Sequence, residues 1–132
     1  MNPLKAVDPR IADRMMDELK ARIAEAPGEY GPTPEDYGCT VLLTAQGNLY
    51  SEVYINAEQR EAEERLLELL SQRGDTEVEY VLCLPLLAPA CWMVKLLPEL
   101  HPHNLETRVL LPQEGDPRSR TIRECQPPKR QD

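Results

Sequence analysis

The feature that most constrains this fold is the run from Val78 to Leu84, in which apolar side chains occupy nearly every position. A strand with one solvated face alternates apolar and polar residues, whereas an almost unbroken apolar run is typical of a strand covered on both faces. Gly74 lies just before this run and Pro85 just after it, and both residues favour chain breaks. The sequence therefore predicts a short, buried strand within a layered fold.

The segments before this strand predict a helix and a β-hairpin. Asp8 and Pro9 suit the start of an amphipathic helix over residues 9–26, because Asp favours the N-cap and Pro the first helical position. The apolar side of that helix recurs every four residues, at Ile11, Met15, Leu19 and Ile23. Cys39 to Ala45 and Leu49 to Ile55 are two β-rich runs, joined by a Gly-containing turn that is typical of a hairpin.

The remaining segments predict a helix on each side of the buried strand and then a last strand. Asn56 with Gln59 resembles a capping box at the start of the first helix. A second helix is predicted over Ala90 to Leu97, limited by Pro98, and a strand over Leu105 to Leu111. The order of helix, β-hairpin, helix, strand, helix, strand indicates an α/β fold, with a mixed β-sheet and flanking helices in two or three layers.

The charge balance limits the partners of the chain. Among 132 residues, 23 are acidic and 15 are basic, which gives a formal net charge of −8. Binding to nucleic-acid phosphates or to an anionic membrane surface needs clustered Lys and Arg, so we do not expect the acidic body to bind nucleic acid. The most apolar stretch, Tyr80 to Val94, is shorter than the ~20 residues that span a bilayer, and we expect no membrane association.

The cysteines and the chain ends indicate a cytoplasmic or nuclear protein of one domain. The cysteines are widely spaced and form no C-x-x-C pattern, which predicts reduced thiols: Cys39, Cys83, Cys91 and Cys125. Residues 1–10 lack the apolar core of a signal peptide. We predict a single domain over residues 1–112 and a mobile basic tail over 113–132, where Ile122 is the only aliphatic residue. That tail is interpreted as a solvated terminus, or alternatively as an electrostatic contact or nuclear-import patch.

Two helix starts carry the pattern of a metal site. Glu61-Ala62-Glu63 precedes a Leu-rich turn, and Pro89-Ala90-Cys91-Trp92-Met93 follows a strand. From Thr40 to Leu111 the chain resembles the cytidine deaminase-like superfamily, nearest to the polynucleotide deaminases of the AID/APOBEC-like group. Those enzymes carry H-x-E on one helix and P-C-x-x-C on the next, where one His and two Cys bind zinc and the Glu transfers protons. The resemblance implies that Glu63 is retained.

By the same resemblance, Glu61, Ala90 and Met93 replace the three zinc ligands. Alanine offers no ligand, a thioether binds zinc weakly, and one carboxylate alone cannot retain the ion for catalysis. Without zinc, Glu63 has no activated water to serve. The resemblance therefore implies no cofactor and a vestigial site at Glu61, Glu63, Ala90 and Met93. We expect a catalytically inactive protein that acts through protein–protein interaction, with a protein partner or by self-association.

Other interpretations of these residues stay open. Residues 58–64 are rich in charge, which is typical of a solvated helix face, and this would include Glu61, Glu63 and Glu64. Cys91 could be a nucleophile served by His101 or His103, or simply a small buried side chain. Two other functions also remain: an active zinc-dependent cytidine or nucleic-acid deaminase that draws ligands from Cys83, Cys91 or the two histidines, and an unrelated small α/β adaptor.

Overall fold

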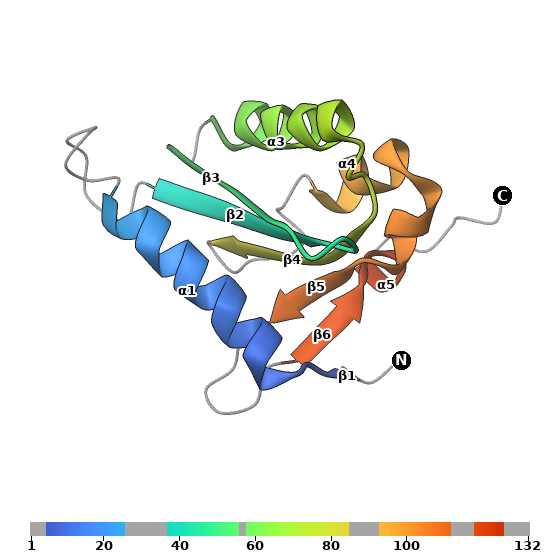
Figure 1. The fold of residues 1–132 in the computed structure, drawn as a ribbon, viewed down its shortest axis with the longest axis horizontal. Coiled ribbons are helices and arrows are strands. Elements are labelled where there is room, and N and C mark those ends of the chain that lie inside the picture. Colours follow the sequence, from blue (N-terminus) through green and yellow to red (C-terminus); the bar gives the residue numbers. More distant parts are fainter. Residues whose placement is uncertain (1–4, 26–36, 56–57, 85–92, 112–117, 126–132) are drawn as a thin grey trace, which may run out of the picture.

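The computed structural model describes residues 5–25, 37–55, 58–84, 93–111 and 118–125. The elements in chain order are β1 (Lys5–Ala6), α1 (Pro9–Glu25), β2 (Tyr37–Thr44), β3 (Leu49–Ile55), α3 (Gln59–Arg73), β4 (Val78–Leu84), α4 (Met93–Leu100), the 3₁₀ helix η3 (Pro102–Glu106), β5 (Arg108–Leu111), β6 (Arg118–Thr121) and α5 (Ile122–Cys125). Figure 1 shows these elements around one sheet.

The sheet has six strands in the order β1-β6-β5-β4-β2-β3. The β4 and β5 strands are parallel, and the other neighbouring strands are antiparallel. The buried strand predicted from the apolar run is β4, and it lies between β2 and β5 with the predicted bounds. The predicted α/β class with a mixed sheet is therefore confirmed.

Helices cover both faces of this sheet, so the fold has three layers (Figure 1). On one face, α1 packs Ala12, Met15 and Leu19 against apolar residues of β2 and β4. On the other face, α3 and α4 pack against β2, β4 and β5. Because neighbouring residues of a strand point to opposite faces, β2 sends Val41 towards α1 and Leu42 towards α3 and α4.

The two early helices show how local sequence sets their ends. At the start of α1, the Asp8 side chain accepts a hydrogen bond from the backbone N–H of Arg10 at 2.9 Å, as its predicted N-cap role requires. At the end of α3, Gly74 adopts φ +66°, a left-handed conformation that lets it close the helix through the carbonyls of Leu70 and Ser71. The start of α3 differs from the prediction: Glu58 is the N-cap without a side-chain bond, and Asn56 lies outside the described residues.

The prediction of a mobile tail over 113–132 is wrong for residues 118–125. Arg118–Thr121 forms β6, which pairs with β5 on one side and with β1 on the other. Ile122 then begins α5 and is fully buried in the core beneath α3 and α4. Backbone hydrogen bonds to two neighbouring strands order this polar stretch, although it lacks an apolar pattern of its own. The two-residue strand β1 was not predicted either.

Two further boundaries near α4 differ from the prediction. The α4 helix extends through Pro98 to Leu100, while the predicted residues before Met93 lie outside the described part of the chain. The last predicted strand begins at Arg108 rather than at Leu105, because residues 102–106 form η3. The side chain of His101 caps η3 by accepting a hydrogen bond from the backbone N–H of His103.

Candidate functional site

Glu63 lies inside the fold. Its side chain is 0% exposed, whereas Glu61 and Glu64 are exposed on the same helix. One residue step turns an α-helix by about 100°, so Glu63 falls beside Ala62 on the side of α3 that faces the sheet. The interpretation as a solvated helix face is therefore right for Glu61 and Glu64 and wrong for Glu63.

Four neighbours surround the Glu63 carboxylate, and we call the five residues the Glu63 cluster: Thr40, Tyr54, Gln59, Glu63 and Cys83. The Thr40 hydroxyl donates a hydrogen bond to Glu63 Oε2 at 2.5 Å, and Gln59 Nε2 donates to the same oxygen at 3.3 Å. The Tyr54 and Thr40 hydroxyl oxygens are 2.9 Å apart. Because the Thr40 proton points to the carboxylate, Tyr54 is the donor to Thr40.

The sheet and the helix fix these positions through their register. Thr40 and Cys83 are paired across β2 and β4, so both side chains point to the face that α3 covers. The Cys83 sulfur lies 3.7 Å from Thr40 Oγ1 and 3.9 Å from Glu63 Oε2. A buried carboxylate costs free energy unless it is hydrogen-bonded, and here Thr40 of β2 and Gln59 of its own helix donate to it. The cluster therefore ties α3 to the centre of the sheet.

Burial controls the acidity of the groups near this cluster. It raises the pKa of Tyr54; the hydrogen bond with Thr40 acts in the opposite direction, and the negative charge of Glu63 raises the pKa further. Burial also raises the pKa of the Cys39 thiol to about 12. Tyr54 is thus a protonated donor at neutral pH, and Cys39 is not a thiolate nucleophile.

The structure brings together only part of the predicted vestigial site. Met93 is fully buried at the start of α4, in the same apolar cluster as Cys83. Glu61 instead lies on the exposed side of α3. Ala90, together with Pro89 and Cys91, falls outside the described residues. Glu63 and Met93 therefore share the layer between the helices and the sheet, and Glu61 does not point into it.

Cys83 takes part in a disulfide. The prediction of reduced thiols is therefore wrong for Cys83, while Cys39 is a free, buried cysteine. A disulfide sulfur is not a thiolate, so Cys83 in this state supplies no thiolate ligand for zinc.

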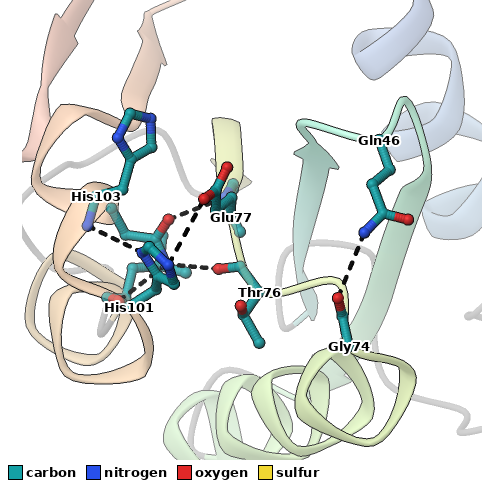
Figure 2. Close-up of polar contacts among 9 residues, drawn as sticks. Gln46, Gly74, Thr76, Glu77, His101 and His103 are labelled. Atoms are coloured by element: carbon teal, nitrogen blue, oxygen red, sulfur yellow. Dashed lines mark hydrogen bonds and ion pairs between the residues drawn. The ribbon is translucent and has the colours of Figure 1, made fainter.

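The two predicted histidines lie at the other end of β4. His101 Nε2 is 3.6 Å from Glu77 Oε1, and His101 Nδ1 accepts a hydrogen bond from the His103 backbone N–H at 3.1 Å (Figure 2). Glu77 directly precedes β4, and five residue-to-residue steps of about 3.3 Å each lead from Val78 to Cys83, or about 16 Å. The histidine pair is thus remote from the Glu63 cluster. Among the side chains that the structure describes, no group of three or more His, Cys, Asp or Glu could hold a metal ion.

Among the buried polar residues that sequence reasoning missed are an aspartate and an asparagine, of which the first is Asp75. This residue is 2% exposed, and its Oδ2 atom accepts hydrogen bonds from Thr44 Oγ1 and Asn48 Nδ2 at 2.9 Å each and from the Tyr50 hydroxyl at 3.1 Å. These three donors belong to the β2–β3 hairpin, so Asp75 fastens the end of α3 to that hairpin. The helix-ending Gly74, which directly precedes Asp75, was the one sequence signal that could have drawn attention to this position.

The second missed residue is Asn104 in η3, which is 0% exposed. Its Oδ1 atom accepts a hydrogen bond from the Val78 backbone N–H at 2.9 Å. Its Nδ2 group donates to the carbonyls of Thr76 at 2.9 Å and Leu97 at 3.0 Å. Asn104 thereby links α4, η3 and the start of β4. No pattern in the sequence marks it, because all three partners are backbone atoms.

No protein-family model matches this chain, and no curated protein matches it. Within the described part of the chain, no helix is both long and apolar enough to cross a membrane.

Proposed function

We propose that this protein is a catalytically inactive, deaminase-like protein that acts through protein–protein interaction and carries no cofactor. The observation that carries the proposal is the state of Glu63, which by the sequence resemblance corresponds to the proton-transferring Glu of the H-x-E pattern. Its carboxylate is fully buried and accepts hydrogen bonds from Thr40 and Gln59. A general acid–base must reach the reacting atoms of a substrate, and this carboxylate instead joins a helix to a sheet.

The surroundings of Glu63 support the same proposal. Met93, which stands where the resemblance implies the second Cys ligand, is fully buried within an apolar cluster. Cys83, whose sulfur lies 3.9 Å from Glu63 Oε2, belongs to a disulfide. The exposed Glu61 has no thiolate or imidazole partner among the described residues that could complete a tetrahedral zinc site. A deaminase-like site whose Glu serves packing is suited to binding rather than catalysis, because the site and not the fold decides the function.

The test combines metal analysis with a deaminase assay. Purified protein is expected to contain far less than one zinc per chain. Neither the wild type nor Glu63→Gln should deaminate cytidine, deoxycytidine or single-stranded oligonucleotides, with an active zinc deaminase as the positive control. Stoichiometric zinc, or product from the wild type that Glu63→Gln fails to form, would overturn the proposal.

A further inference from the structure

The strand β3 lies at one border of the sheet, and one of its two sides pairs with no described strand. It is the last strand in the sheet order, and among the described strands it pairs with β2 alone. The pairing runs without a register shift from Leu43 opposite Leu49 to Tyr37 opposite Ile55. The outer side of β3 is therefore a straight edge over seven residues.

The hairpin turn shows which backbone groups point outward. The Thr44 N–H donates to the Asn48 carbonyl at 2.9 Å, so this pair closes the hairpin by a hydrogen bond. Hydrogen-bonded pairs alternate along an antiparallel ladder, which makes Tyr50 and Glu52 bond towards β2. The N–H and C=O groups of the intervening residues Leu49, Ser51, Val53 and Ile55 then point to the outer edge.

This edge lacks the devices that usually block strand addition. It contains neither proline nor lysine, and no bulge interrupts its pairing. Its single charge, Glu52, binds Arg65 of α3 at 2.9 Å. At the opposite border of the sheet, the described part of β1 has two residues, and a very short edge strand is itself such a device.

Negative charge gathers along the α3 side of this edge. The carboxylates of Glu52, Glu58 and Glu61 all act on Arg65 and raise its pKa, the largest effect being the hydrogen bond to Glu52. One guanidinium thus stands among three carboxylates, and Glu58 and Glu61 are exposed. A second copy of this chain would add its own charge of −8 to this surface, whereas a basic segment would neutralise it.

We propose that the β3 edge binds an extended basic segment of a partner protein, which adds to the sheet as a seventh strand beside β3. The outward groups of Leu49, Ser51, Val53 and Ile55 supply the main-chain hydrogen bonds. Lys or Arg at alternate positions of the segment bind Glu58 and Glu61, since alternate side chains of a strand share one face. The inference rests on the proposed interaction function and names the surface and the partner chemistry.

The test uses a labelled seven-residue peptide in which Lys alternates with Thr and Val, matching the length of β3. Binding is measured by fluorescence anisotropy and by hydrogen exchange of the β3 amides. We expect saturable binding that protects the amides of Ser51 and Val53, and no binding of the counterpart peptide with Glu in place of Lys. Equal binding of both peptides, or binding without protection at these amides, would overturn the proposal.

Matched variants locate the contact. Val53→Pro removes an outward N–H and leaves the ladder to β2 intact, because proline is tolerated on an edge strand. We expect about a tenfold loss of affinity, the effect of about 1.4 kcal/mol. Glu58→Gln with Glu61→Gln should weaken binding to a similar extent, whereas Glu79→Gln with Glu99→Gln, which removes the same charge at exposed sites elsewhere, should not. Equal losses for both pairs would show non-specific attraction and refute the site.

Two further results separate the possible failures. A wild-type dimer that Val53→Pro converts to monomers would make a second copy the occupant of the edge, and would overturn the basic-segment proposal. Zinc-dependent deamination would overturn the proposed function, but would leave the peptide and exchange data on the edge unaffected.

Discussion

The two faces of the sheet differ in how many buried polar groups they contain. The face beneath α1 is packed with apolar side chains such as Met15, Leu19 and Val41. The face beneath α3 and α4 also has an apolar core, but the buried carboxylates and the buried amide among the described residues all lie on this side: Glu63, Asp75 and Asn104. Apolar contacts are non-directional and tolerate changes of shape, whereas buried hydrogen bonds demand particular atoms. The face with Glu63 should therefore be the more sensitive one to chemical change at constant volume.

The largest expected effect comes from removing the Glu63 side chain. Glu63→Ala should lower the free energy of unfolding by about 4 kcal/mol, because it opens a cavity and leaves buried donors of the Glu63 cluster unpaired. Glu63→Gln, which keeps the volume and one acceptor oxygen, should lose less than half as much. Urea unfolding followed by circular dichroism measures both. A loss under about 1 kcal/mol for Glu63→Ala would show that the buried carboxylate does not join α3 to the sheet.

A smaller loss is expected from an isosteric change at Asn104. Asn104→Asp replaces the donor to the Thr76 and Leu97 carbonyls by an acceptor, which should lower the free energy of unfolding by about 3 kcal/mol. The matched change beneath α1 is Met15→Leu, which conserves volume and should lose less than about 1.5 kcal/mol. Similar losses in the free energy of unfolding at the two positions would show that the two faces do not differ in this sensitivity.

The smallest effect is a pH dependence of the free energy of unfolding, which comes from Cys39 on the face beneath α1. The unfolded Cys39 thiol loses its proton near its ordinary pKa of 9.0, whereas burial keeps it protonated to about 12 in the folded protein. The folded state then binds more protons, so its stability must fall as the pH rises above 9, by up to about 1.4 kcal/mol per pH unit. Unfolding curves between pH 8 and pH 10 should show this slope, and Cys39→Ala should flatten it. An unchanged slope in the variant would assign the effect to other groups.

The sequence predicted those elements whose signals are local. Asp8 and a four-residue apolar repeat placed α1, and the apolar run placed β4 with its observed bounds. By contrast, β6 reads Arg-Ser-Arg-Thr and shows no strand pattern, because its order comes from backbone pairing with β5 and with β1. Lys5 and its partner Ser119 are more than a hundred positions apart. Such pairing leaves no mark within a local window of sequence.

In the candidate site, too, the features that depend on distant parts of the chain were not predicted. The charge-rich segment 58–64 predicted a solvated helix face for Glu63, but its burial depends on Thr40 and Cys83, which reach it from two other elements. The local sequence therefore did not distinguish Glu63 from the exposed Glu61. Asn104 was missed for a related reason, since its partners are a backbone N–H and two carbonyls that only the folded chain brings together.

The pairing of β1 with β6 also has a consequence for biosynthesis. A ribosome delivers the chain from its N-terminus, so Lys5 and Ala6 emerge long before Ser119 and Arg118, the residues with which they pair. During that interval α1 can dock on the hairpin, but β1 cannot join the sheet because its partner β6 has not yet been synthesised. On the nascent chain, β6 should therefore be inserted between two strands that have already been made.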